Sequence, residues 1–478
     1  MKQIVWLALT LVCASASAQN ITEQNVEKTL ALIDKAVAAH GGDKLMAITS
    51  VVTHWEDINI ASGQSLRPDP PWDRRTTTGM SAIDLTDEQF YTRAWGSGGG
   101  FEFNNAAIIN GDASYQVNYR AGTAQPIAEP DFNTRSGPFV RVTPALLMRQ
   151  LQSRTQNAHF LGTSQVGDVD YNVIAFSMAV GPSVSLYFHP TTNQLHRSER
   201  FLPGFGLVEY RFNDYTMVEG VAFNQKFELY VAGEENLKRT INKTQINQPL
   251  GEWLAVDDSL SVTAALEPDP LTRQKIGEGV YLIGGSGTYA MFVEMSDHVI
   301  AVGGTAGLPD RIASLRELVD KPIRYGALTH HHSDHVLAVP AYEEEGATVI
   351  ASSAHEGAAR AAAGDAETLK FEGVDKKLTM NDDQQHVEFI DIGPTAHTEH
   401  LLVAWLPKQK ILFEADHFAV PRAGPVPPAG SGAQDFAKAL KKWRIKPSKI
   451  VSAHSPKPGT MDDLKEALEK KPLKTGAI

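Results

Sequence analysis

The stretch Thr329-His330-His331-His332-Ser333-Asp334-His335 places five metal-capable side chains in six consecutive positions. Imidazole and carboxylate groups are ligands for zinc and related metals. On an extended segment, side chains two residues apart project to the same side, so His330 and His332 can share one metal ion. Asp334 and His335 can then turn toward a second ion. The stretch predicts a metal site and indicates a metalloenzyme.

The flanks of this stretch distinguish it from a histidine tag or a low-complexity tract that scavenges metal. An apolar-rich segment, 322–328, precedes the histidines, and Val336-Leu337-Ala338-Val339-Pro340 follows them. This context is typical of a buried strand that ends in a loop. Isolated histidines are commonly surface or hydrogen-bonded residues, but clustered His and Asp at ligand spacing favour a metal site.

Length and composition limit the classes of protein to consider. A chain of 478 residues exceeds the usual size of one hydrophobic core, so two domains are expected. With 42% hydrophobic and 21% charged residues, the composition is that of an ordinary globular protein. The formal net charge of -12 does not favour nucleic acid as a partner, because proteins that bind it usually carry a basic face.

The N-terminus predicts a secretory signal peptide over residues 1–18. Lys2 precedes an apolar run from Ile4 to Ala14, and Ala16-Ser17-Ala18 forms an Ala-x-Ala cleavage site. The alternative, a membrane anchor, is disfavoured because the run is too short to span a bilayer, and no other apolar stretch approaches that length. The only cysteine, Cys13, lies within the predicted signal peptide. A periplasmic or secreted protein without disulfides is expected.

Residues 19–255 predict an N-terminal, β-rich domain. Helical spacing over 26–48 gives way to β-forming segments between Val51 and Ile246, which predict a mainly antiparallel sheet. The helix end Ala38-Ala39-His40-Gly41-Gly42 and the strand pattern of 187–215 resemble the periplasmic lipoprotein-carrier fold. That resemblance implies a curved sheet packed on a helix, with a concave apolar face that holds an acyl chain or orients substrate. A scaffold or dimerisation domain is the alternative.

Proline-containing and glycine-containing segments at 247–251 and 267–270 indicate a linker, and residues 262–478 predict a second domain. Its strands and helices alternate, which implies helices covering sheets. Strands are expected at 279–284, 291–302, 347–351, 386–392, 401–406, 411–413 and 450–453, and helices at 309–319, 354–363, 435–443 and 461–470.

Three further candidate ligands occur in this domain, each where a predicted strand ends. His397 lies in the loop after 387–392, Asp416 follows the strand at 410–413, and His454 closes the strand at 449–453. Functional side chains commonly occupy such loops. Together with the histidine stretch, they complete a pattern that resembles the metallo-β-lactamase superfamily over about residues 262–478. This resemblance implies an α/β fold, an αβ/βα sandwich, with metal ions at one edge and the antiparallel β domain before it.

The resemblance also implies a ligand set. His330, His332 and His397 would bind the first metal ion; Asp334, His335 and His454 would bind the second. Asp416 would bridge them, and Asp334 and Asp416 would be the catalytic carboxylates. Two Zn²⁺ ions are favoured, with iron and manganese left open. His331 is not expected to be a ligand, and His386, His400 and His417 would be bystanders or would support ligands from outside the site.

Two departures from the family pattern stand out. The family commonly has an acidic residue at the end of its second long strand, where it supports a ligand, but here the segment reads Ala301-Val302-Gly303-Gly304. Loss of such a partner weakens metal sites. His400 occupies a position where the family tends to have glycine, so it adds either a proton-transfer group or only a surface residue.

The activity that the resemblance implies is hydrolysis of an ester, lactone, thioester or amide of a small molecule by a bridging hydroxide. A β-lactamase is an alternative. So is an envelope lipid- or ligand-binding protein with a non-catalytic metal site, although all seven implied ligands are present. The proline-rich segment 421–430 is expected to rim the site, either as a selector of substrate or as a simple connection. The native substrate and the oligomeric state stay open.

Overall fold

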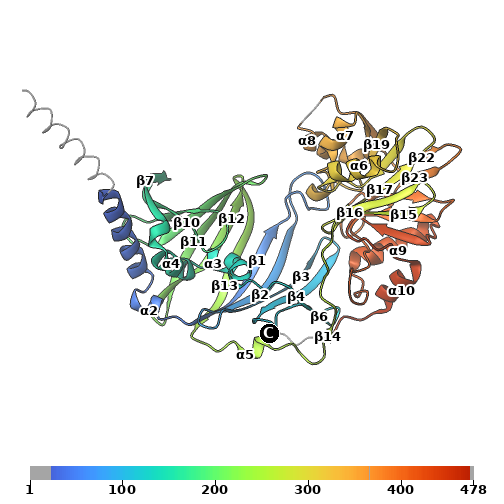
Figure 1. The fold of residues 1–478 in the computed structure, drawn as a ribbon. Helices are drawn as coiled ribbons and strands as arrows, with labels where there is room; N and C mark the ends of the chain where they lie inside the picture. The colour runs from blue at the N-terminus through green and yellow to red at the C-terminus, as the bar shows by residue number, and fades with distance from the viewer. Residues whose placement is uncertain (1–22, 365–366, 474–478) are drawn as a thin grey trace, which may run out of the picture.

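The computed structural model describes residues 23–364 and 367–473, so the predicted signal peptide lies outside the described residues (Figure 1). A large curved sheet forms the first part of the chain, and a sandwich of two smaller sheets forms the second (Figure 1). The mixed α/β fold class with a β-rich first part is therefore confirmed.

Fourteen strands make up the first sheet, in the order β14-β6-β5-β4-β3-β2-β1-β13-β12-β11-β10-β9-β8-β7. All neighbours pair antiparallel except β14 and β6. The strands are β1 (Ser50–Ile60), β2 (Arg74–Asp84), β3 (Gln89–Gly98), β4 (Phe101–Ile109), β5 (Tyr115–Asn118), β6 (Thr123–Pro126), β7 (Ala158–Val166), β8 (Val169–Phe176), β9 (Val184–Phe188), β10 (Leu195–Leu202), β11 (Gly206–Val218), β12 (Val221–Val231), β13 (Glu234–Ile246) and β14 (Ser261–Val262).

Helices cover the concave face of this sheet. Residues 23–39 are helical, and α2 (Asp43–Met46), α3 (Phe132–Arg141) and α4 (Pro144–Ser153) lie with them inside the curve (Figure 1). A single apolar core joins buried residues of these helices, such as Ile33 and Leu147, to inward-facing strand residues such as Phe188. The predicted curved sheet packed on a helix is thus present, but its concave face is filled by the protein's own helices.

The second part of the chain has a seven-stranded sheet, β15 to β21 in sequence order, and a five-stranded sheet, β22 to β26. A short helix, α5 (Gly251–Leu254), precedes them. Their strands are β15 (Thr272–Gly277), β16 (Val280–Gly285), β17 (Thr288–Glu294), β18 (Val299–Val302), β19 (Ile323–Ala327), β20 (Thr348–Ser352), β21 (Phe371–Val374), β22 (Lys377–Asn381), β23 (His386–Asp391), β24 (Leu402–Leu406), β25 (Ile411–Glu414) and β26 (Lys449–Ser452).

The two sheets pack face to face, and helices cover the outer face of each. Met291 and Phe413 belong to the apolar layer between the sheets. Outside the larger sheet lie α6 (Leu308–Arg316), α7 (Val339–Glu344) and α8 (Glu356–Ala362), and outside the smaller one lie α9 (Ser431–Trp443) and α10 (Met461–Glu469) (Figure 1). Phe436 and Leu440, one helical turn apart, bury the inner face of α9.

One sequence prediction needs correction. The stretch 291–302 was expected to be a single strand, but β17 ends at Glu294 and β18 begins at Val299. A tight turn, closed by the Met295 N–H donating to the His298 carbonyl at 2.8 Å, reverses the chain between them. The strands on either side are buried on both faces, but Ser296 and Asp297 in the turn are polar and exposed, so the sequence did contain a turn signal that the prediction overlooked.

The two parts of the chain meet at two loops of the first sheet. The β1–β2 loop (61–73) and the β3–β4 turn (99–100) reach the sandwich, to which β1–β4 point (Figure 1). The Ser333 N–H donates to the Gly63 carbonyl at 2.8 Å, and the Gly432 N–H donates to the Gly100 carbonyl at 2.9 Å.

Among the described residues, no helix is long and apolar enough to cross a membrane.

Gly100 permits the closest of these approaches. Its φ is +81°, and an added Cβ would lie 3.1 Å from Gly432 Cα and 3.2 Å from His397 Cβ. We expect Gly100→Ala to lower the free energy of unfolding of the protein by about 1–3 kcal/mol, because it adds backbone strain and crowds the junction. Denaturant unfolding followed by fluorescence measures this.

Gly111→Ala is the matched control for that substitution. Gly111 also has a positive φ, +53°, but nothing lies within 4 Å of an added Cβ. Gly111→Ala adds the same backbone strain without the crowding, so it should lower the free energy of unfolding by less than Gly100→Ala does. Equal losses would contradict the close approach as the reason for glycine at position 100.

Candidate metal centre

The fold brings the candidate ligands to one edge of the sandwich because each follows the end of a strand. The histidine stretch follows β19, Asp416 follows β25 and His454 follows β26. β25 and β26 are parallel neighbours, so their carboxyl ends lie at the same edge. His397 reaches the same place from the loop between β23 and β24.

Two groups of ligand atoms result. In each group the atoms lie within 4.8 Å of one another. The first group is buried, with His330 fully so; the second is more open, with Asp334 exposed. The first comprises His330, His332, His397 and Asp416, and the second comprises Asp334, His335 and His454.

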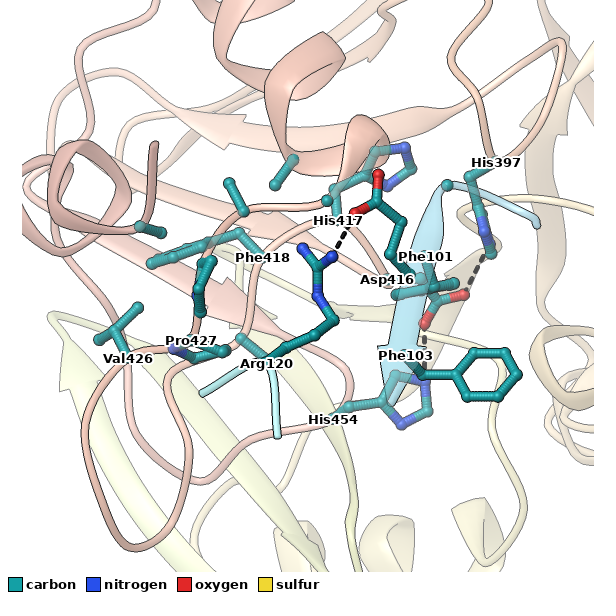
Figure 2. Close-up of a pocket in the computed structure, with 18 of the residues that line it drawn as sticks. Phe101, Phe103, Arg120, His397, Asp416, His417, Phe418, Val426, Pro427 and His454 are labelled. Atoms are coloured by element: carbon teal, nitrogen blue, oxygen red, sulfur yellow. Dashed lines mark hydrogen bonds and ion pairs between the residues drawn. The ribbon is translucent and has the colours of Figure 1, made fainter. Parts of the chain in front are cut away.

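Asp416 joins the two groups. Its Oδ2 lies 3.2 Å from His330 Nε2 and 3.0 Å from each Nε2 of His335 and His397. Its Oδ1 lies 2.8 Å from His454 Nε2. In Figure 2 the carboxylate stands between His397 and His454, with an interaction drawn to each. One carboxylate therefore faces both groups, as the bridging role requires.

Protonation in the site suits metal binding. Burial lowers the pKa of His332 to about 2 and holds that of His330 well below its usual value. Burial alone would raise the pKa of Asp416, but the surrounding imidazoles, His335 first, outweigh it and keep that pKa well below its usual range. A neutral imidazole at His330 and His332 and an ionised carboxylate at Asp416 are the forms that a metal cation needs.

The backbone around Glu414 directs Asp416 to the metal groups. The Glu414 carboxyl is fully buried and accepts hydrogen bonds from the backbone N–H groups of His417 and Phe418, at 2.8 and 3.3 Å. Burial raises its pKa to about 8. These bonds close a turn after β25, and Asp416 lies within that turn.

The donors of the first group fit zinc, and their free atoms face the group. His332 donates through Nε2 to the Ser65 carbonyl at 3.0 Å, while its Nδ1 is buried without a partner in the described part of the chain. His397 bonds through Nδ1 to the Gly99 carbonyl at 2.6 Å, which leaves Nε2 toward Asp416. A ring N–H held by a carbonyl fixes the tautomer and offers the other nitrogen to a metal.

Both of these carbonyls come from the N-terminal sheet, and so does a partner of the second group. Gln64 donates through Nε2 to Asp334 Oδ1 at 2.7 Å. Sequence patterns did not indicate that Gln64, Ser65 and Gly99 would contact the candidate ligands. For Gly99 a signal existed, because the run 96–100 contains four glycines and glycine permits close backbone approach. For Gln64 and Ser65 no local signal marks the role.

The remaining histidines form contacts beside the metal groups. His331 bonds to the Ser65 carbonyl at 3.0 Å and, through Nδ1, to His355 at 3.2 Å. His400 pairs with Asp391 at 2.7 Å, and its ring lies near that of His355. His417 contacts Thr395 at 3.0 Å, while its ring packs edge-on against His397.

His386 pairs with Glu388 at 3.3 Å. His331, as expected, lies outside both ligand groups. Of His386, His400 and His417, it is His417 that packs against a candidate ligand, His397.

The chain lacks the acidic residue that the family commonly has at the end of its second long strand, and the structure leaves no space for it. At the end of β18, an added Cβ on Gly304 would lie 1.7 Å from the His335 carbonyl oxygen, so no side chain fits there. His335 Nδ1 is buried and has no hydrogen-bond partner in the described part of the chain. His335 thus lacks the outer support that the carbonyls give His332 and His397.

A cavity of about 500 Å³ opens beside the metal groups. Asp334, Asp416 and His454 lie on its wall, as does the segment Val426–Gly430, so part of the proline-rich loop does rim the site. Phe101 and Phe103 of β4 line the opposite side (Figure 2). Members of both metal groups therefore line the cavity: His397 and Asp416 of the first group, and Asp334 and His454 of the second.

Comparison with known proteins agrees with this geometry. Residues 284–454 match the model of the metallo-beta-lactamase superfamily. Similar solved structures include a metallo-beta-lactamase from Pontibacter korlensis, 21% identical over 42% of this chain and 97% of that chain, with a TM-score of 0.34. Another is from Hirschia baltica, 19% identical over 41% of this chain and 96% of that one, with a TM-score of 0.33.

No curated protein matches the chain. The family match includes all seven candidate ligands between His330 and His454. Over residues 284–454 the chain therefore carries a metallo-β-lactamase superfamily domain, which indicates a metal-dependent hydrolase.

The Gln64 contact yields a test of how the N-terminal sheet supports the site. We expect Gln64→Ala to weaken binding at the second metal group about 10-fold to 100-fold, since loss of a ligand's hydrogen-bond partner typically has that effect. The first group, which Gln64 does not contact, should keep its affinity. Titration of the metal-free protein with Zn²⁺ against a fluorescent chelator separates the two affinities.

Gln116→Ala is the control. Gln116 lies in β5 of the same sheet and bonds to the Ala106 carbonyl at 3.0 Å, away from the ligands. It should leave both affinities unchanged. If Gln64→Ala binds metal like the unsubstituted protein, Gln64 does not position Asp334.

Proposed function

We propose that the protein is an exported hydrolase that holds two zinc ions and cleaves an ester, lactone, thioester or amide bond of a small molecule. The observation that carries this proposal is the Asp416 carboxylate, which faces a three-histidine group through Oδ2 and His454 of the second group through Oδ1. A shared carboxylate of this kind is the arrangement that two neighbouring metal ions need.

Two bound metal ions supply Lewis acidity and acidify water enough for attack at neutral pH. The protein's own groups set the geometry of that attack. The Asp416 side chain is only 9% exposed and is held by its imidazole neighbours, so it fixes the spacing of the two groups. Gln64 holds Oδ1 of Asp334, which directs Oδ2 toward His335, 3.4 Å away. Asp334 is thereby placed to orient a water molecule at the cavity wall.

Replacement of the shared carboxylate tests the proposal. We expect Asp416→Ala to reduce hydrolysis of a responsive ester or lactone at least about 100-fold, because a metal pair contributes several kcal/mol to transition-state stabilisation. Metal content, measured by mass spectrometry of the purified protein, should fall as well. Asp310→Ala, at an exposed position in α6, is the control and should change neither quantity.

Retention of full activity by Asp416→Ala would refute the metal-dependent mechanism. Two bound ions without turnover on esters, lactones, thioesters, amides or β-lactams would instead favour a binding protein with a non-catalytic metal site.

Export is the second part of the proposal, and it rests on the signal sequence before Gln19. The mature chain is expected to begin at Gln19, since signal peptidases cleave after the Ala-x-Ala motif. Expression of the full chain in a Gram-negative host, followed by fractionation and mass spectrometry of its N-terminus, tests this. A cytoplasmic protein that retains residues 1–18 would contradict export.

A further inference from the structure

The cavity beside the metal groups has walls from both parts of the chain. One wall is the outer face of β4 and the residues after β5, and the other is the segment after Asp416 with α9 and α10 (Figure 2). The sandwich alone would leave the cavity open on one side. The side chains of both walls therefore determine which substrates fit the cavity.

The first wall is aromatic. Phe101 and Phe103 are two residues apart in β4, so their side chains lie on the same face of the strand. The Phe101 ring packs edge-on against the ring of the ligand His397, with centroids 5.3 Å apart, yet 48% of the residue is exposed. A large aromatic residue exposed beside a metal ligand is available for contact with a substrate.

The second wall is also apolar. Phe418 and Val426 are buried, and Pro427, Pro428 and Ala429 continue the surface to Ala433 of α9. Small ligands are usually held by such apolar walls, with a few polar groups fixing their orientation. A cavity of about 500 Å³ is large enough for a substrate with a substantial apolar group.

Metal ions apart, the side chains on the wall offer no free cation to an anionic substrate. Of the lining residues, all described, Arg120 carries the only guanidinium or ammonium group. Its guanidinium is 15% exposed and forms an ion pair with Glu102, also on the wall (Figure 2). A buried carboxylate on the substrate would need a partner of its own, since an unpaired charge is costly to bury.

We propose that the substrate is an uncharged ester or lactone whose apolar acyl chain lies in this cavity between Phe103 and the segment Val426–Ala429. This inference rests on the proposed hydrolase function and narrows it. In the reaction, water adds its oxygen to the carbonyl carbon, the acyl carbon–oxygen single bond breaks, and the released alcohol takes a proton from the water. Penicillins and cephalosporins, which carry a carboxylate, fit the cavity less well than a neutral acyl compound does.

A series of neutral p-nitrophenyl esters, from acetate to decanoate, tests this with the zinc-loaded full chain. Each buried methylene should raise kcat/KM about fourfold until the cavity is filled. Esters of the same length that end in a carboxylate, such as mono-p-nitrophenyl adipate against the hexanoate, should be poorer substrates. A flat chain-length profile, or faster hydrolysis of the anionic members, would overturn the inference.

Two variants assign the effect to the cavity. Phe103→Ala removes part of one wall, and Asn105→Trp, at an exposed position that also lines the cavity, fills it. Both should abolish the preference for long acyl chains while the zinc content stays unchanged. Phe201→Ala is the matched control, because Phe201 is a 67% exposed phenylalanine in β10 that does not line the cavity.

Binding of the neutral fluorescent probe N-phenyl-1-naphthylamine separates this inference from the hydrolase proposal. The probe should bind the unsubstituted protein and Phe201→Ala, and Phe103→Ala and Asn105→Trp should weaken its binding about tenfold or more. Probe binding with this pattern but without turnover of any ester, lactone, thioester or amide would refute the hydrolase proposal and support the apolar cavity. Equal probe binding by all four proteins, or none, would overturn the cavity assignment whatever the turnover.

Discussion

The buried carboxylate of Asp416 is the group on which the rest of the site depends. It is surrounded by four imidazoles from three different segments, at 2.8 to 3.2 Å. An ionised carboxylate in a dry environment is tolerated only with close polar or cationic partners. The strand ends after β19, β25 and β26 must therefore converge, and the face-to-face packing of the two sheets holds them there.

The N-terminal sheet is part of the same centre. Two of its carbonyls, at Ser65 and Gly99, hold the rings of His332 and His397, and Gln64 holds Asp334. These contacts position ligands of both metal groups without touching a metal themselves. The same edge of the sheet presents Phe101 and Phe103 to the cavity. Positioning of ligands and shaping of the substrate site are thus combined in one pair of loops and one strand.

Sequence patterns predicted most elements of the sandwich and the chemistry of its edge. Ligand types at strand ends are a local signal, and the helices and strands around them follow ordinary periodicity. The hairpin between β9 and β10 turns at Asn193, whose φ of +55° is one that asparagine tolerates. The division between β17 and β18 was missed, although the turn between them contains the exposed polar residues Ser296 and Asp297, which are typical of turns.

By itself, the sequence determined which atoms could bind metal, because imidazole and carboxylate chemistry belongs to the residue and not to its surroundings. The resemblance to the metallo-β-lactamase superfamily also implied that such residues meet at one edge of the sandwich. Only the tertiary structure decided which nitrogen of His332 faces the metal group, that no side chain fits at Gly304, and that a sheet formed more than 200 residues upstream closes the cavity. Backbone carbonyls such as those of Ser65 and Gly99 carry no sequence signature, so their role appears only when distant segments pack together.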